Sequence, residues 1–117
     1  MTQQTEHQMR LESICFDEIA ADLKLVELRL LDEKRSKISI GDIIEFKKRP
    51  NLEESITVRV TNIKTYSSWQ ELVNDTPLKY FGPRWKSKKD LIESSSGYDS
   101  EKEQKYQNVA FYISRVK

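Results

Sequence analysis

Apolar and polar residues alternate in five stretches of the chain, a pattern typical of β-strands with one buried face. The longest stretch places Ile56, Val58 and Val60 on one face, and its phase slips after Thr61, which predicts a β-bulge. The five predicted strands lie at about 7–11, 24–31, 43–48, 56–66 and 109–116.

Three other stretches follow the period of an α-helix. In the first, Phe16, Ile19 and Leu23 fall at positions i, i+3 and i+7 and form one apolar stripe. Because strands outnumber helices, we expect a mainly β (α+β) fold, a small barrel of five to six strands with helices inserted on its outside. The helices are predicted over about 13–22, 69–74 and 88–94.

Length and composition limit the class of protein. The chain has 117 residues, 37% hydrophobic and 33% charged, and its formal net charge is +1. We expect one domain over residues 7–117 behind a flexible tail of residues 1–6. One cysteine allows no disulfide within the chain, and no apolar run approaches a membrane span, so a cytoplasmic protein is expected. The balanced charge argues against a wholly basic protein but leaves room for a local basic patch.

The region between Phe16 and Phe46 resembles the ASCH domain, named for activating signal cointegrator homology and similar in fold to the PUA domain. The resemblance lies in the order of a helix, the strand at 24–29, the charged loop at 32–35 and the strand that ends at Phe46. It continues more weakly through Val58–Val60 and 66–72. It implies a closed β-barrel beside a cleft that binds RNA or a nucleotide-like ligand.

Some small ASCH proteins are amidohydrolases that act on an acetylated cytidine, and others are described as ribonucleases. Amidohydrolase-type members carry a Lys, a Thr three residues later as the proposed nucleophile, and an Arg two residues further. Here Lys24 and Arg29 keep their places, but Glu27 replaces the Thr, and a carboxylate cannot take the same role with the same activation. The companion acid of that site would fall near Gly82 and Pro83, neither of which is acidic.

The replacement of the nucleophilic Thr by Glu27 favours a nucleic-acid-binding module over an amidohydrolase. Whether the chain is an enzyme stays open. A hydrolase acting on a nucleoside or on RNA would use Lys24 and Glu27 as its catalytic candidates.

Candidate ligand-binding residues begin with Glu27 and Arg29, which share one face of a strand because they are two residues apart. Lys24 falls on the other face, so it reaches the same cleft only if the preceding turn redirects it. Lys34 and Arg35 offer cations for phosphate groups. A surface ion pair and a solvated loop are the structural alternatives for these charges. The full predicted set is Lys24, Glu27, Arg29, Lys34, Arg35, Ser67, Ser68 and Trp85.

Ser67 and Ser68 precede a predicted helix whose first backbone N–H groups can bind an anion, although serine there is commonly a helix cap. The stretch at 79–86 mixes aromatic rings with cations, so Trp85 can stack on a base. A protein-interaction role for the loop at 80–85 is a further alternative. No metal site and no cofactor are predicted, because the single histidine, His7, has no neighbouring ligand cluster. The expected partner is RNA or a nucleotide-like ligand, without membrane contact, and the oligomeric state is not predicted.

Overall fold

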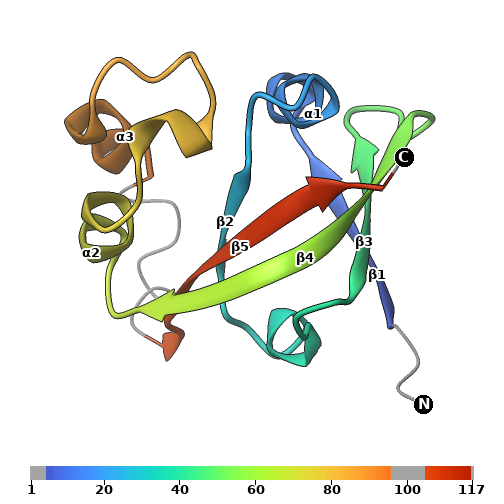
Figure 1. The fold of residues 1–117 in the computed structure, drawn as a ribbon, viewed down its shortest axis with the longest axis horizontal. Coiled ribbons are helices and arrows are strands. Elements are labelled where there is room, and N and C mark those ends of the chain that lie inside the picture. Colours follow the sequence, from blue (N-terminus) through green and yellow to red (C-terminus); the bar gives the residue numbers. More distant parts are fainter. Residues whose placement is uncertain (1–4, 96–104, 117) are drawn as a thin grey trace.

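The centre of the protein is a five-stranded sheet in the order β1-β3-β4-β5-β2 (Figure 1). The computed structural model describes residues 5–95 and 105–116. β1 and β3 run parallel, the other neighbours run antiparallel, and the sheet curls into a half-barrel. The predicted mainly β fold with inserted helices is therefore confirmed. The strands are β1 (Glu6–Leu11), β2 (Val26–Leu30), β3 (Ile43–Lys48), β4 (Ser55–Tyr66) and β5 (Asn108–Arg115).

All five predicted strands are present, with small shifts at their ends. β1 begins at Glu6, so this residue belongs to the sheet and not to the predicted tail, whose residues 1–4 lie outside the described part. The register between β4 and β5 shifts between Val60 and Asn62, which confirms the predicted bulge.

The three predicted helices are also present. α2 and α3 lie together on one side of the sheet, and α1 stands apart from them (Figure 1). α1 is followed by Asp22, whose φ of 61° is the left-handed conformation that aspartate tolerates better than most residues. The helical segments are α1 (Ser13–Ala20), α2 (Trp69–Asn74) and α3 (Lys88–Ser95), with single 3-10 turns η1 (Arg35–Lys37) and η2 (Leu78–Phe81).

Buried apolar side chains form two clusters, one on each face of the sheet. The inner cluster includes Phe16 of α1 together with Phe46 and Phe111. The outer cluster includes Leu72 of α2 and Leu91 of α3. Strand β5 contributes to both clusters, because successive side chains of a strand point to opposite faces. The helices α2 and α3 therefore cover the face of the sheet that α1 does not cover.

Strand β2 is buried on both faces, and its charged side faces inward. Directly opposed residues of an antiparallel pair lie on the same face of the sheet. Glu27 is opposite Phe111 and Arg29 is opposite Val109, so both charged side chains share the face of the inner cluster. Val26 belongs to the outer cluster. The predicted alternation is correct, but the apolar side of β2 packs beneath α2 and α3, and its charges face the half-barrel.

Asp42, just before β3, connects the N-terminal end of β1 to the turn that precedes β3. Its side chain accepts hydrogen bonds from the backbone N–H of Ser39 at 2.9 Å and of Thr5 at 3.4 Å, and lies 2.9 Å from Nε2 of His7. Burial acts to raise the pKa of this carboxyl. The hydrogen bonds from His7, Ser39 and Thr5 outweigh burial and lower the pKa of Asp42 below its ordinary value of 3.8.

A carboxyl group with a lowered pKa in the folded state stabilises the protein above its ordinary pKa, and this contribution is lost as the pH falls through the lowered value. Asp42→Asn is therefore expected to reduce the free energy of unfolding at neutral pH by about 1–3 kcal/mol. The difference from wild type should shrink as the pH falls below 3.8. Urea denaturation of both proteins across this pH range measures it, and a difference that stays constant down to acid pH would contradict the assignment.

Candidate functional site

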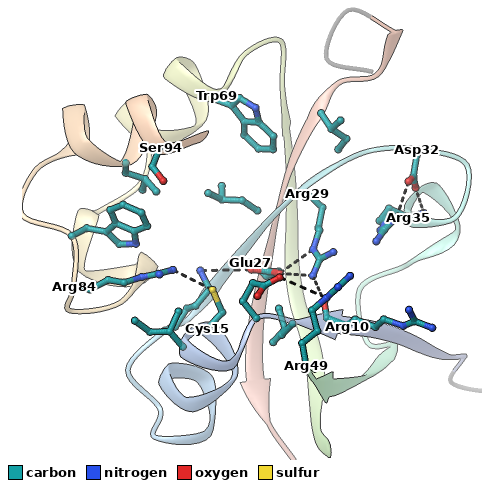
Figure 2. Close-up of a pocket in the computed structure, with 18 residues that line it drawn as sticks. Arg10, Cys15, Glu27, Arg29, Asp32, Arg35, Arg49, Trp69, Arg84 and Ser94 are labelled. Carbon is teal, nitrogen blue, oxygen red and sulfur yellow. Dashed lines mark hydrogen bonds and ion pairs between the residues drawn. The ribbon is translucent and has the colours of Figure 1, made fainter. Parts of the chain in front are cut away.

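A cleft of about 460 Å³ opens beside β2. Figure 2 shows Arg10, Arg29 and Arg49 on one side of Glu27, and Arg84 beside Cys15 on the other. Trp69 of α2, labelled in Figure 2, and Trp85 of the loop before α3 also line the cleft. The ionisable groups of the lining are mostly basic. Six are cations and three are carboxylates, namely Arg10, Lys24, Arg29, Arg35, Arg49 and Arg84 against Glu12, Glu27 and Asp32.

Glu27 is the most buried carboxylate of the cleft lining, with 6% of its surface exposed. Its Oε2 accepts hydrogen bonds from Nε of Arg29 at 2.9 Å and lies 2.8 Å from Nη2 of the same residue. Its Oε1 lies 3.6 Å from Nζ of Lys24. Burying a carboxylate is costly unless opposite charges and hydrogen bonds compensate it. The inner wall of the cleft is therefore a compensated cluster of one acid and two bases.

Arg29 also bridges the two edges of the half-barrel. Its Nη2 donates a hydrogen bond of 2.9 Å to the backbone carbonyl of Arg10. β1 and β2 are the edge strands, and within the described strands no backbone pairing joins them. One guanidinium group thus connects Glu27 on β2 to the backbone of β1.

Lys24 reaches the cleft although strict alternation places it on the other face of the strand. The chain leaves α1 through the left-handed Asp22, and the backbone N–H of Lys24 donates to the carbonyl of Glu18 at 3.2 Å. The lysine is 5% exposed, and its ammonium group lies 6.0 Å from the ring centroid of Phe81. The turn before β2 therefore redirects the side chain of Lys24 into the cleft, as the sequence required for Lys24 to be part of the site.

Arg35 lines the cleft, whereas Lys34 is exposed and is not among its lining residues. The Nη1 of Arg35 lies 2.7 Å from Oδ2 of Asp32, and its backbone N–H donates to Oδ1 of Asp32 at 2.9 Å. Asp32 thus fixes the η1 turn and pairs with the guanidinium group at the same time. The charged loop supplies one cation to the cleft, and that cation is already paired.

Ser67 and Ser68 lie at the start of α2, outside the cleft lining. The hydroxyl of Ser68 accepts a hydrogen bond of 3.1 Å from the backbone N–H of Glu71, and the hydroxyl of Ser67 donates one of 2.7 Å to the Glu71 carboxylate. Ser68 is therefore the N-cap of α2, and Ser67, the residue before it, is held by the Glu71 carboxylate. The structure thus places Ser68 in the capping role that the sequence left as the alternative, and it places Ser67 beside the cap.

The sequence highlighted the stretch at 79–86 and its Trp85, which lines the cleft, but it did not select Arg84. The guanidinium carbon of Arg84 lies 4.6 Å from the ring centroid of Trp85, and Nη2 donates to Sγ of Cys15 at 3.1 Å. Burial raises the pKa of the Cys15 thiol, and the positive charges of Lys24 and Arg84 offset only part of that rise. The cation–aromatic pair at positions 84 and 85 is the local signal that points to Arg84.

Arg10 and Arg49 also line the cleft, and no local pattern in the sequence marks them. Arg10 lies on β1, and Arg49 follows the end of β3. The parallel pairing of these strands brings them together, and the backbone N–H of Arg49 donates to the carbonyl of Leu11 at 2.9 Å. Only the pairing of two distant segments could reveal these residues.

No helix in the described part of the chain is long and apolar enough to cross a membrane. Between residues 5 and 95 and between 105 and 116, no group of three or more His, Cys, Asp or Glu side chains is arranged to hold a metal ion.

Comparison with known proteins identifies the family. The family model of the ASCH domain matches residues 9–117. The crystal structure of the hypothetical protein PH0355 is 33% identical, with a TM-score of 0.82, over 96% of this chain and 100% of that one. The solution NMR structure of protein PF0455 from Pyrococcus furiosus is 34% identical, with a TM-score of 0.73, over 97% and 99% of the two chains. The chain belongs to the ASCH domain family.

A more distant structure shares the fold. The crystal structure of a ZmASCH mutant protein from Zymomonas mobilis has a TM-score of 0.64 at 14% identity, over 95% of this chain and 68% of that one. No curated protein matches the chain.

The compensated cluster of Glu27, Arg29 and Lys24 predicts how substitutions of Arg29 and Glu27 change the free energy of unfolding. Arg29→Met is expected to lower the free energy of unfolding by about 3–5 kcal/mol, because Glu27 stays buried without its hydrogen-bond donor. Adding Glu27→Gln should recover part of this loss, because the uncompensated carboxylate is then gone. Urea denaturation of the wild type, both single variants and the double variant gives the coupling energy. Strictly additive effects would show that the two side chains do not depend on each other.

Proposed function

We propose that this ASCH domain binds RNA, or a nucleotide-like ligand with phosphate groups, in the cleft beside β2. The observation that carries the proposal is the concentration of charge. Six basic and three acidic side chains line the cleft, although the net charge of the whole chain is only +1. Lysine and arginine hold phosphate groups without regard to base sequence, so such a surface suits a nucleic-acid backbone.

The size and the aromatic lining of the cleft support the same class of ligand. A volume of about 460 Å³ lies within the range of roughly 300–1,000 Å³ that small-molecule sites occupy. Trp69 and Trp85 line the cleft, and aromatic faces stack on unpaired bases of any sequence. We therefore expect an unpaired nucleotide or a single-stranded segment as the occupant, because a duplex offers no free base faces.

Of the residues selected from the sequence, Lys24, Glu27, Arg29, Arg35 and Trp85 share this cleft. In the proposed complex the cations attract phosphate groups, Glu27 positions Arg29, and Trp85 stacks on a base. Contacts from Lys34, Ser67 and Ser68 stay predictions, because these residues lie outside the lining, and the proposal does not require them.

A protein-interaction role for the loop at 80–85 has less support. Phe81 is fully buried, and Tyr80 packs edge-on against Tyr112 with ring centroids 6.3 Å apart. Trp85 packs against the outer cluster. Tyr80 and Phe81 thus pack within the protein, and the half-buried Trp85 lines the cleft, so the loop offers no separate aromatic surface outside the cleft for a protein partner.

One observation favours a second function. Lys24 and Glu27 are both buried and lie 3.6 Å apart at the inner wall, as a general acid and base of a hydrolase would. Acetylated cytidine and RNA added to the binding reactions distinguish the two functions. Released acetate or shortened RNA, lost on Lys24→Ala, would establish catalysis, and intact substrates would leave binding as the function.

RNA binding should depend on the exposed cations of the cleft. The double variant Arg10→Ala/Arg49→Ala removes two of them without touching Glu27 or its partners. We expect about tenfold or greater loss of affinity for a short single-stranded RNA, and a slope of log affinity against log salt that is shallower by about 0.7 for each lost phosphate contact. Fluorescence polarisation of a labelled RNA across a salt series measures both quantities.

A matched control removes the same charge elsewhere. Lys64 and Lys79 are exposed and do not line the cleft, so Lys64→Ala/Lys79→Ala should change the affinity much less. If the wild type fails to bind RNA at low salt, or if both double variants lose affinity equally, the cleft is not the RNA site.

A further inference from the structure

The arginines of the cleft differ in how closely carboxylates engage them. Arg29 lies 2.8 Å from a carboxylate oxygen of Glu27, and Arg35 lies 2.7 Å from one of Asp32. Arg84 makes a longer contact, with Nε 3.4 Å from Oε1 of Glu18. Within the described part of the chain, that oxygen accepts no hydrogen bond. Arg84 is therefore paired more loosely than Arg29 or Arg35. Arg49 is also loosely paired, with Nε 3.7 Å from Oε1 of Glu12, but both side chains of that pair are largely exposed, whereas Glu18 is buried.

The other contacts of Arg84 are also easily exchanged. Its Nη2 donates to the sulfur of Cys15 at 3.1 Å, and a thiol sulfur is a weak acceptor. Its guanidinium group lies over the ring of Trp85 at 4.6 Å. Stacking on an aromatic face leaves the N–H groups at the edge of the guanidinium plane able to reach a phosphate. About a third of the side chain, 32%, is exposed in the cleft.

Glu18 lies behind Arg84 and is itself buried, with 7% of its surface exposed. It lies on α1, and its carboxylate occupies the space where a side chain at position 82 would begin, so any Cβ on Gly82 would collide with it. Gly82 also has a φ of +106°, which favours glycine. The segment that carries Arg84 and Trp85 therefore lies directly against the Glu18 carboxylate.

Stability alone does not explain this arrangement. A buried carboxylate with an oxygen that accepts no hydrogen bond is costly, and a long contact to a partly exposed arginine compensates only part of that cost. The arrangement does orient a cation. It directs the guanidinium group of Arg84 across the cleft, opposite Arg29 and against Trp85.

We propose that Arg84 is a phosphate-binding residue of the cleft, in addition to the exposed Arg10 and Arg49, and that Glu18 is its positioning residue. The inference rests on the proposed function and names the group that meets the ligand's phosphate. On binding, Arg84 exchanges its contact with Cys15 for charge-assisted hydrogen bonds to a phosphate monoester or diester, which are shorter and stronger. Arg29 stays between β1 and β2 with Glu27.

The test combines single and double variants in the polarisation assay. Arg84→Ala should weaken binding of a short single-stranded RNA about tenfold and flatten the salt slope by about 0.7. Arg84→Lys, which keeps the charge without the planar fork, should fall between Arg84→Ala and wild type. Lys79→Ala removes one charge from η2, outside the cleft lining, and should leave the affinity near that of wild type.

Glu18 is tested through its dependence on Arg84. Glu18→Gln should weaken binding several-fold and leave the salt slope unchanged, because the cation is still present but is no longer oriented. In the Arg84→Ala background, the same substitution should have no further effect. If Glu18→Gln weakens binding equally in both backgrounds, or if Arg84→Ala binds like wild type, the proposal is wrong. Thermal unfolding of each variant confirms that the fold is intact.

Inorganic phosphate separates this proposal from the proposed function. If phosphate binds and its binding is lost in Arg84→Ala, Arg84 forms a phosphate site whether or not RNA binds. If RNA binds, and the binding of neither RNA nor phosphate depends on Arg84, the proposed function is supported and the proposed role of Arg84 is wrong. If neither RNA nor phosphate binds the wild type, both proposals fail.

Discussion

The buried carboxylate of Glu27 is the constraint on which the arrangement of the cleft depends. It lies on the inner face of an edge strand, opposite Phe111 of the inner apolar cluster, and only 6% of its surface is exposed to solvent. Arg29 and Lys24 compensate its charge, and Arg29 also reaches the backbone of β1. The same interaction thus satisfies a charge and connects the two edges of a half-barrel.

This constraint divides the cations of the cleft by role. Arginines that are closely paired with carboxylates, such as Arg29 and Arg35, shape the wall and contribute charge from fixed positions. Arg84 is paired more loosely, and it is the group we propose for direct contact with phosphate. A count of basic residues would treat these arginines as equal. Their partners show that they are not, because an arginine already bonded to a carboxylate loses those bonds if it turns toward a ligand.

Alternation and helical periodicity predicted the elements of the fold, because they depend on local contacts with a core. The bulge after Thr61 was visible as a change of phase. The burial of both faces of β2 was not visible, because α2 and α3 come from a distant part of the chain. For the same reason Arg10 and Arg49 were missed, since the β1–β3 pairing brings them together. Glu18 was missed because its significance depends on Gly82, a glycine far along the chain. The ASCH resemblance predicted the cleft beside β2, and the side-chain contacts then distinguished among its cations.

The central claim is that Glu27 keeps Arg29 between the edge strands while Arg84 meets the ligand. The most direct measurement follows the arginine Nε–Hε signals in two-dimensional proton–nitrogen NMR spectra during titration with a short single-stranded RNA. Arg29→Lys and Arg84→Lys assign the two signals. The account predicts that the Arg84 signal shifts with saturation while the Arg29 signal stays in place. A shift of Arg29 with an unchanged Arg84 would contradict it.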